Sequence, residues 1–452
     1  MSSSAYCRLV CLILLCCGPC HAAWQAGLGR VDITPREPVP LAGYGGKTRL
    51  SQGVDHPIWL KALALRDERG QTLLWIGSDL VGLSQRMVER ITADALAKHG
   101  LKREQLLLNC SHNHSCPVTE DVLWLYYEMT PEEKEATQRY TQQVYLAYQE
   151  VIAAALKDLR AAEVFFEQGL AGVAVNRRRS RGPESRAFGG QVDQDVPVLA
   201  IKSDGRLRGF FFGYSCHTTA LGGLSINGDY AGYAMERLER DQPGVLAGFI
   251  QNCGGDANPL PRLRGRDREA KALAQGYGDI LAEAVRQVLE GPMKPLQGEL
   301  RLSHGQIDLP LEPGLSQQEI ESRLPKLSGM PRREFQHFLS QYQRLGRLPD
   351  AVPYPIQVAR LGSDLLLIAL TGETVVDYSL QFKAALGWNQ TWVSGYNNDL
   401  TSYIPSLRVL REGGYEGLTG MYEYGHRAAY SPQVEELIHR EVQRQVKALR
   451  HP

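Results

Sequence analysis

The sequence predicts an α/β protein in which mixed central β-sheet layers are flanked by helices within one large catalytic-type domain. The first observation is that short apolar runs alternate with longer amphipathic stretches along the chain. The second is that the apolar runs are rich in Val, Ile, Leu and Phe, as buried strands are. The third is the absence of any repeat with a period of roughly 20–50 residues, which argues against a solenoid or propeller.

The apolar runs predicted as strands are residues 72–76, 105–108, 198–201, 209–214, 245–250, 356–361 and 365–370. The stretches predicted as helices are residues 84–98, 131–159, 268–289, 316–343 and 432–449. The start at residue 131 is well marked, because Thr130 can cap the helix and Pro131 suits its first turn. Glu132 and Glu133 then lie near the positive helix end, where acidic side chains are favourable.

The composition excludes two classes of protein. The chain has 452 residues with 50 basic and 50 acidic side chains, so its formal net charge is zero. A nucleic-acid-binding protein held by a general positive field is therefore not expected. Hydrophobic residues make up 43% and charged residues 22%, which is ordinary for a globular chain and unlike a disordered one.

Residues 1–22 are predicted to be a signal peptide and residues 23–452 the mature domain. Arg8 precedes a short apolar run, and cleavage is expected after Ala22 or Ala23. Neither this run nor any later stretch is long and apolar enough to cross a bilayer. We therefore expect a secreted or periplasmic protein without a transmembrane segment. Peripheral membrane contact is compatible with the sequence. The sequence leaves the oligomeric state open.

Cleavage removes the cysteines of the leader and leaves an even number, which are Cys110, Cys116, Cys216 and Cys253. In an oxidising compartment two disulfides are permitted, and we expect at least one. No pair has the C-x2-C spacing of a structural zinc knot.

Residues 177–190 and 310–353 have the composition of insertions. Both are polar, and the second is biased toward helix and punctuated by proline. A surface insertion is the favoured interpretation of each. The alternative is a lid over a binding groove.

The strongest local signal is the pair His112 and His114, which directly follows the predicted strand at 105–108. One histidine is usually structural, but two spaced as H-x-H beside Ser and Asn favour a metal site. His217 follows the predicted strand at 209–214 in the same way. The carboxyl ends of strands are where α/β sheets present ligands.

Glu373 comes soon after the predicted strand at 365–370, where it is a candidate ligand or helix cap. The Gly254-Gly255 pair after another strand is more typical of a structural turn. Tyrosines such as Tyr403 in a polar loop are more often packing residues than ligands. Taken jointly, two histidine motifs and a glutamate at strand ends favour a catalytic zinc with an open position, and not calcium. The chain has no G-x-S-x-G elbow, no P-loop and no H-E-x-x-H helix.

These motifs together resemble those of the neutral/alkaline, non-lysosomal ceramidase family. The run GLGRVDITPREPVPLAGYGG at 27–46 looks like that family's opening strand and loop, and SHNHSCP at 111–117 looks like its S-H-T-H-S-G-P motif. HPIWLKALAL at 56–65, His217, NGDYAGYA at 227–234, GGDANP at 254–259, TGE at 371–373 and GYNNDLTSYIPS at 395–406 fall in the family's order. Tyr415 follows Tyr403 by twelve residues, which matches a paired tyrosine spacing in the family. The likeness covers nearly the whole mature chain.

The resemblance implies one zinc ion per chain, with His112, His217, Glu373 and Tyr403 as its ligands. It implies that His114 faces the substrate as the acid/base or carbonyl-contacting group. It places Arg177 and Tyr415 along the substrate site, with Arg178 and Arg179 adjoining the arginine.

The chain departs from the family pattern at two points. The ceramidase motif is G-D-x-S-P-N, whereas this chain has Asn258 at the serine position of the motif and no hydroxyl there. The sequence also ends soon after the catalytic-type region, so no C-terminal immunoglobulin-like domain is expected. Both departures leave ceramide itself open as the substrate, with Asn258 shaping the substrate pocket.

We therefore expect an exported, ceramidase-like zinc hydrolase that cleaves an amide bond by a zinc-activated water. Its substrate would be an N-acylated compound, either a sphingolipid-like lipid or another small molecule. One alternative is a metal-containing binding protein that has lost turnover with the motif serine. The other is a metal-dependent esterase or glycan-processing hydrolase.

Overall fold

The computed structural model describes residues 24–179, 190–263 and 267–450. At its centre lies a 13-stranded mixed sheet. The strand order is β13 (Leu246–Gln251), β11 (Arg206–Tyr214), β10 (Asp195–Ser203), β8 (Arg160–Leu170), β1 (Trp24–Asp32), β4 (Trp59–Asp67), β5 (Thr72–Ser78), β6 (Leu106–Cys110), β20 (Thr391–Asn397), β18 (Leu365–Thr371), β17 (Ala351–Leu361) and β16 (Leu300–Pro310), with β15 (Lys294–Leu296) beside β8. The pairs β5–β6, β11–β13 and β18–β20 are parallel. Every other pair of neighbours in this sheet is antiparallel, so the predicted mixed sheet is confirmed.

The sheet curves so that its two halves face each other. Strand β13, at one end of the order, returns to the middle of the sheet, where Asn252 forms an isolated bridge with Ser394. Strand residues alternate between the two faces, so Leu73 and Trp75 point into the space between the halves while Leu74 points outward. The enclosed core contains Trp24, Leu63, Trp75, Leu107, Phe166, Leu199, Phe211, Ile250, Leu367 and Trp392.

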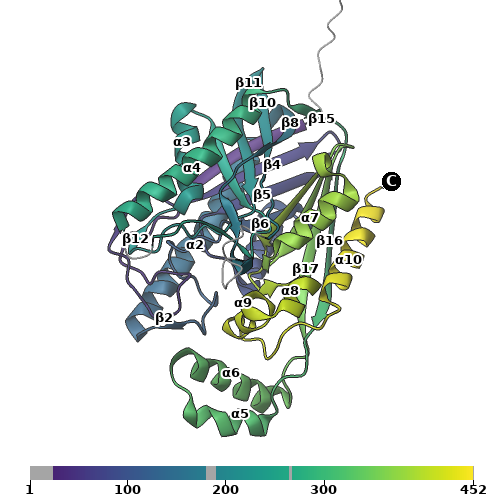
Figure 1. Cartoon of the computed structure of the whole chain (residues 1–452). Helices are drawn as coiled ribbons and strands as arrows, with labels where there is room; N and C mark the ends of the chain where they lie inside the picture. The colour runs from purple at the N-terminus through teal and green to yellow at the C-terminus, as the bar shows by residue number, and fades with distance from the viewer. Residues whose placement is uncertain (1–23, 180–189, 264–266, 451–452) are drawn as a thin grey trace, which may run out of the picture.

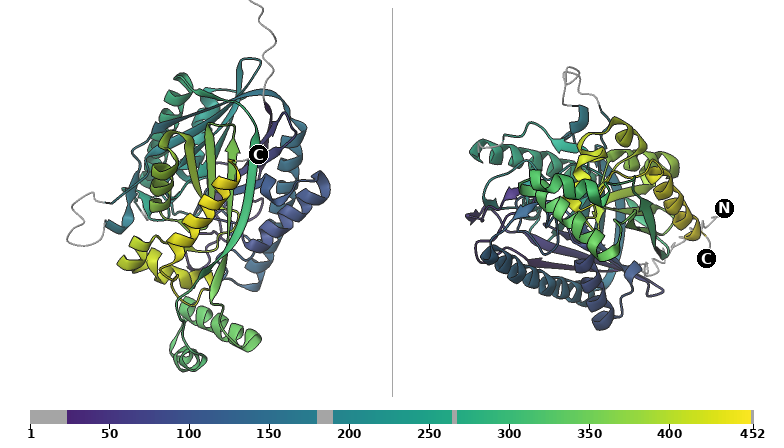
Figure 2. Two further views of the ribbon diagram at one scale, coloured as in Figure 1. Left: turned by 90° about the vertical axis from the view of Figure 1, so that its right-hand side faces the viewer. Right: turned by 90° about the horizontal axis from the view of Figure 1, so that it is seen from below.

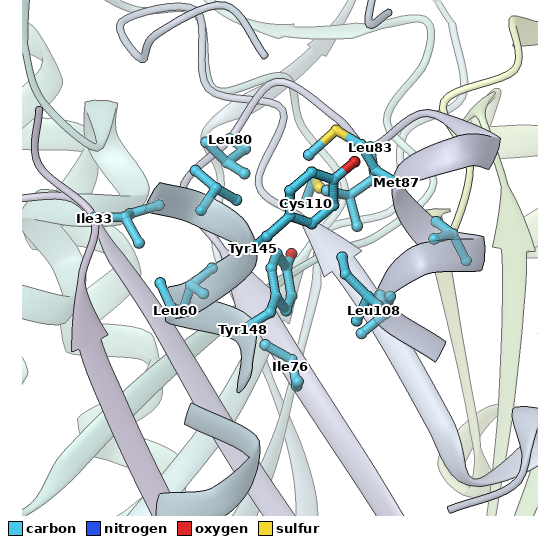
Figure 3. Packing of buried hydrophobic residues seen from close by; sticks show 14 of the residues in the cluster. Ile33, Leu60, Ile76, Leu80, Leu83, Met87, Leu108, Cys110, Tyr145 and Tyr148 are labelled. Carbon is cyan, nitrogen blue, oxygen red and sulfur yellow. The ribbon is translucent and has the colours of Figure 1, made fainter. Parts of the chain in front are cut away.

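Helices cover the outer faces of this curved sheet (Figures 1 and 2). Three pairs of helices each cover a different part of the outer surface of the sheet. The pairs are α1 (Gln85–His99) with α2 (Pro131–Lys157), α3 (Asp229–Asp241) with α4 (Asp267–Glu290), and α7 (Val376–Leu386) with α10 (Val434–Ala448). Figure 3 shows Tyr145 and Tyr148 of α2 packed among Leu60, Ile76 and Met87 under the first pair. This packing, more than helix propensity, stabilises helices of such length.

The short elements form small two-stranded ladders near the carboxyl ends of the main strands. They are β2 (Gly46–Lys47) with β7 (Tyr127–Glu128), β3 (Gly53–Val54) with β12 (Ser225–Ile226), β9 (Ala174–Asn176) with β14 (Ala257–Pro259), and β19 (Glu373–Thr374) with β21 (Tyr403–Ile404). Short helical segments follow two of these ladder strands in the sequence. The 3₁₀ segment η2 (Arg177–Arg179) follows β9, and α8 (Leu407–Glu412), α9 (Gly414–Gly417) and the 3₁₀ segment η5 (Thr419–Tyr424) follow β21.

All the predicted strands are present, and the predicted start of α2 is confirmed. The Thr130 hydroxyl accepts the backbone N–H of Glu133, whose carboxylate accepts the N–H of Thr130 at 2.8 Å. The single helix predicted at 316–343 is wrong, because the chain forms α5 (Gln317–Arg323) and α6 (Gly329–Leu345). Pro325 lies in the break and lacks an N–H, and Gly329 has a φ of 58° that a right-handed helix does not allow.

The block at 310–353 is an insertion between the paired strands β16 and β17, and it forms the α5–α6 hairpin at one end of the molecule (Figure 1). The hairpin contacts other loops: Arg333 Nε donates to the carbonyl oxygen of Leu125 at 3.0 Å, and the rings of Phe338 and Tyr422 lie 6.3 Å apart. The predicted insertion at 177–190 lies mostly outside the described residues. The predicted signal peptide lies wholly outside the described residues. No helix in the described ranges is long and apolar enough to cross a membrane.

The expected disulfide is absent from the described chain, and that prediction is wrong. Cys110, Cys116, Cys216 and Cys253 are free and buried. Cys110 and Cys116 belong to the core under α1 and α2, Cys216 to the core under α3 and α4, and Cys253 to the core under α7 and α10. Each thiol fills space in an apolar cluster, and those of Cys110 and Cys116 also hydrogen-bond to Ser78 and to the carbonyl oxygen of Asn113.

We predict that unfolded, unreduced mature protein contains four titratable thiols, and that the folded protein reacts slowly with a thiol reagent. Burial raises the pKa of Cys110 to about 12 and raises those of the other three cysteines further, so the reactive thiolate is scarce. Thiol titration before and after denaturation checks this. Fewer than four thiols in the unfolded chain would restore the disulfide.

Candidate metal centre

The predicted ligand-type residues meet at one place, although they come from distant parts of the sequence. His112 follows β6, His217 follows β11 and Glu373 begins β19 just after β18. The two histidines are each 1% exposed and Glu373 is 2% exposed. They form the one group of three such side chains within the described ranges whose donor atoms all lie within 4.8 Å of one another.

The glutamate lies between the two imidazoles. Glu373 Oε2 is 3.2 Å from His112 Nε2 and 3.0 Å from His217 Nε2. The ligand atoms of a tetrahedral zinc with bonds of about 2.0–2.1 Å are roughly 3.3 Å apart. The spacing of these three atoms therefore suits one small ion.

Backbone carbonyl groups determine which nitrogen of each histidine faces this point. His112 Nδ1 lies 2.8 Å from the carbonyl oxygen of Val81, and His217 Nδ1 lies 2.7 Å from that of Gly254. A carbonyl oxygen only accepts, so each Nδ1 carries the proton and each Nε2 presents its lone pair. Metal-binding histidines are oriented by this type of contact. His112 also has a φ of 56°, an uncommon backbone conformation that is often found at functional sites.

The tyrosine predicted as a fourth ligand lies beside the glutamate. In the parallel ladder β19–β21, Glu373 pairs with Tyr403, so the two side chains leave the backbone on the same side. The Tyr403 ring is stacked on that of His217 with centroids 6.5 Å apart. The four side chains offer two imidazole nitrogens, one carboxylate oxygen and one phenol oxygen. These donor types fit a zinc ion.

Arg177 connects this cluster to a second charged group. Its Nη2 donates to the Tyr403 hydroxyl oxygen at 3.1 Å, and its Nη1 lies 3.4 Å from His217 Nε2. Its Nε donates to Glu416 at 2.6 Å, and Arg178 Nη1 donates to the other oxygen of that carboxylate at 2.6 Å. Arg177 therefore contacts two of the predicted ligands, His217 and Tyr403. Arg178 supports the same glutamate from the other side.

His114 lies against the cluster, beside His112. Its Nε2 is 3.0 Å from His112 Nε2, and its Nδ1 is buried without a hydrogen-bond partner. Gly43 has a φ of 89°, and a Cβ at that position would lie 2.3 Å from the imidazole, so only glycine allows this ring position. Burial above all, and then His112 and His217, lower the pKa of His114 well below its ordinary value. The imidazole is therefore neutral at pH 7.

The remaining predicted substrate residues flank the cluster. The ring of Tyr415 is 5.1 Å from that of Tyr403, and its hydroxyl donates to Glu423 at 2.6 Å. Asn258 is buried in β14, which pairs with β9 just before Arg177, and its Oδ1 has no hydrogen-bond partner. The preceding residue, Ala257, accepts the backbone N–H of His217 at 3.0 Å, so Asn258 adjoins the ligand-bearing loop.

Several residues around the cluster were missed by the sequence analysis. The Tyr424 hydroxyl donates to Glu373 Oε1, and the Tyr396 ring lies 4.7 Å from that of His112 with its hydroxyl unpartnered. Burial raises the pKa of the nearby Glu423 to about 7. Tyr396 lies within the motif at 395–406 and could have been selected from it. Tyr424 and Glu423 follow a glycine-rich loop that carries no such signal.

The charges of the cluster depend on one another. Burial opposes ionisation of Glu373, but His112 and His217 hold its pKa well below the ordinary value. Burial and then the Arg177 charge lower the pKa of His217 to about 4. Burial and the Glu373 carboxylate raise the pKa of Tyr403, and the Arg177 guanidinium opposes this shift. The cluster thus combines an anionic Glu373 carboxylate with a neutral His217 imidazole, and both can act as ligands of a cation.

Comparison with known proteins identifies the fold. No family model and no curated protein matches this sequence. A solved structure of neutral ceramidase from Pseudomonas aeruginosa superposes with a TM-score of 0.72 at 20% identity, covering 93% of this chain and 73% of that one. A ceramidase complexed with C2 superposes with a TM-score of 0.71 at 18% identity, covering 93% and 74%. The chain therefore has the fold of neutral ceramidase, and the resemblance seen in the sequence is supported at the level of the fold.

We predict that Glu416→Gln lowers the free energy of unfolding by roughly 3 kcal/mol, because it leaves two largely buried arginines without their shared anion. The side chains of Arg177 and Arg178 are 19% and 8% exposed. Chemical denaturation of the metal-free protein measures the change. Glu412→Gln is the matched control, since Glu412 is 28% exposed and its loss should cost less than about 1 kcal/mol. Equal losses in the two variants would contradict the prediction.

Proposed function

We propose that this protein is a zinc-dependent hydrolase that cleaves the amide bond of an N-acylated substrate. The observation that carries the proposal is the cluster of His112, His217 and Glu373, whose imidazoles are oriented by backbone carbonyl groups. The ceramidase fold supports it independently, because the matched structures are those of ceramidases.

The ligands of the ion would be His112, His217, Glu373 and Tyr403. When bound, zinc supplies Lewis acidity at this point: it polarises a carbonyl and lowers the pKa of a coordinated water to about 7. Arg177 would favour the anionic form of Tyr403, because its Nη2 donates to the phenol oxygen.

His114 would move the proton. Its neutral imidazole at pH 7 can accept a proton from the attacking water and then pass it to the nitrogen of the leaving amine. As the carbonyl carbon gains the water oxygen, its bond to that nitrogen breaks, so a carboxylate and an amine are released. The Gly43 backbone holds the ring against the cluster throughout.

Asn258 would orient the substrate amide. Its unpartnered Oδ1 is an acceptor that an amide N–H can satisfy, whereas an ester offers no such donor. A hydroxyl nucleophile at this position is then unnecessary, because the attacking group is water. Tyr415, beside Tyr403, would form the adjoining wall.

The proposed substrate is an N-acylated lipid or small molecule, and ceramide is one member of this class. The predicted leader would place the enzyme outside the cytoplasm, in the secreted or periplasmic fraction.

The metal prediction is that purified protein retains about one zinc per chain, and that His112→Ala and His217→Ala each lose most of it. Removing one of two imidazole ligands weakens the site, whereas His99→Ala should bind like the wild type, since His99 is exposed at the end of α1. Elemental analysis of dialysed proteins, with circular dichroism as a check on folding, measures this. Full occupancy in both ligand variants would exclude the proposed centre.

The activity prediction is that His114→Ala keeps its zinc but hydrolyses N-acyl amides about 10²–10⁴-fold more slowly, since it removes the proton-transfer group. Asn258→Ser should change substrate preference without creating activity from nothing. Initial rates on a panel of N-acyl amides and matched esters measure both effects.

Two outcomes would favour the alternatives. A wild type that binds zinc, is inert on the whole panel and gains ceramide hydrolysis as Asn258→Ser would indicate a binding protein descended from a serine-dependent enzyme. A wild type that hydrolyses only the esters would indicate an esterase.

A further inference from the structure

A cavity of about 780 Å³ lies where β11 begins, away from the metal cluster. Its walls come from β1, the end of α2, the turn between β10 and β11, α3 and the segment before β13. β11 runs for nine residues, and His217 follows its far end. At about 3.3 Å per residue, the length of this strand separates the cavity from the metal cluster by roughly 30 Å. The cavity is therefore a separate candidate site.

The cavity is lined by more cationic than anionic side chains. Its charged lining residues are Arg30, Asp158, Arg160, Asp204, Arg206, Arg208 and Glu239.

Two of the three carboxylates are already paired with buried cations. Asp158 accepts Nη2 of the buried Arg208, and it also accepts the backbone N–H of Leu28 at 2.8 Å. Glu239 accepts Nζ of the buried Lys61 at 2.6 Å. These contacts hold both acidic side chains on the wall and compensate their charges.

Three exposed guanidinium groups are left with little compensation. The side chains of Arg30 and Arg160 are 58% and 61% exposed, and each lies only at the limit of an ion pair, 3.9 and 3.8 Å from one of the two carboxylates already paired. Arg206 is exposed, and its guanidinium forms no ion pair with any residue that the structure describes. Among the described lining residues, the Asp204 carboxylate is the remaining negative charge. The cavity therefore presents a net positive charge to an incoming molecule.

The same cavity also has an apolar wall. Leu28, Leu207, Val245 and Leu246 line it, and each of these side chains is only half-buried. Its volume falls within the range of about 300–1,000 Å³ that is usual for pockets that bind small molecules. A ligand that combines an anionic group with an apolar part would therefore match the lining better than a free inorganic ion.

We propose that this cavity binds a phosphate monoester whose substituent is apolar. Guanidinium groups bind phosphate oxygens through paired N–H donors, and the exposed arginines of the lining supply such donors. The dianion offsets the net positive charge, while the substituent covers the half-buried leucines and valine. The same group is presented by a soluble phosphate ester and by the phosphate headgroup of a membrane lipid. The inference does not depend on the proposed amide hydrolysis.

Calorimetric titration with hexyl phosphate, inorganic phosphate and hexanol tests the recognition. Hexyl phosphate should bind one per chain with a Kd below about 1 mM, and about 5-fold or more tightly than inorganic phosphate, while hexanol shows no measurable binding. Equal affinities for hexyl phosphate and inorganic phosphate would overturn the role of the apolar wall.

Cosedimentation with vesicles identifies the source of the phosphate group. The vesicles are pure phosphatidylcholine or phosphatidylcholine with about 20% phosphatidic acid, whose headgroup is a phosphate monoester. Binding to the acidic vesicles without binding of hexyl phosphate assigns the site to a lipid headgroup. The reverse result assigns it to a soluble ester. Binding of neither anionic probe overturns the inference.

Three variants locate the binding. Arg160→Gln combined with Arg206→Gln should weaken binding of the anionic probe about 10-fold or more, because two charged donors are lost. Asp204→Asn should strengthen it about 2- to 5-fold, since it removes the opposing charge and asparagine tolerates the φ of 51° at this turn. Arg36→Gln combined with Arg347→Gln removes two exposed arginines outside the cavity and should bind like the wild type.

His112→Ala separates this cavity from the metal centre. It should bind the anionic probe as the wild type does, because the cavity and the cluster lie at opposite ends of β11. Thermal melting without ligand checks that each variant is folded, and the gain expected in Asp204→Asn decides the matter if the double arginine variant does not fold. Unchanged binding in the folded double variant, no gain in Asp204→Asn, or loss of binding in His112→Ala would overturn the inference and leave the proposed function standing.

Discussion

A single buried asparagine joins the strand ends on which the site is built. The Asn109 amide, at the end of β6, donates to the carbonyl oxygens of Gln251 in β13 and Gly395 in β20, and its Oδ1 accepts the N–H of Gln251 at 2.8 Å. Such groups are costly to leave unpaired in a low-dielectric interior, so the contact is strongly specified. It joins β6 to β13 and β20, close in the chain to His112.

The site depends on how the negative charge of the buried Glu373 carboxylate is stabilised. A buried carboxylate is unfavourable unless it is paired, and Glu373 is nearly fully buried. One of its oxygens faces the two imidazoles and the other accepts the Tyr424 hydroxyl. Gly255 allows this close approach, since a Cβ there would lie 2.4 Å from the Glu373 carbonyl oxygen. A cation between these donors, as proposed above, would add to this compensation.

The chain shares its fold with ceramidases. Asn258 takes the position that the resemblance assigns to a serine, so the side chain there is an amide without a hydroxyl. The α5–α6 hairpin bonds to the backbone of the loop at residues 125–126 and packs on Tyr422 in η5, the segment that also carries Tyr424. Loops and this insertion therefore surround the cluster, while the sheet carries the strands that position His112, His217 and Glu373.

What the sequence by itself determined is local. Continuous apolar runs such as 365–370 predicted strands correctly because both faces of those strands are buried, and the Thr130–Glu133 cap marked α2 because its contacts span only four residues. Histidines and a glutamate that directly follow such strands also predicted a group of metal ligands. The reason is that the carboxyl ends of parallel strands meet at one edge of a sheet. Strands β8 and β16 were missed where half-exposed residues interrupt the apolar pattern. Strands β4 and β20 were missed although they are buried.

Only the tertiary structure decided which distant groups meet. Nothing near Glu416 in the sequence indicates that it binds Arg177 and Arg178, and nothing near Tyr424 indicates that it donates to Glu373. The cysteines follow the same rule: their number permitted disulfides, but the curved sheet distributes them over three separate apolar cores. Short-range patterns in the sequence indicate which strands are buried and where each strand ends. Contacts between residues far apart in the sequence are set by how the sheet curves, because this curvature buries both apolar faces and pairs the Asn109 amide at the same time.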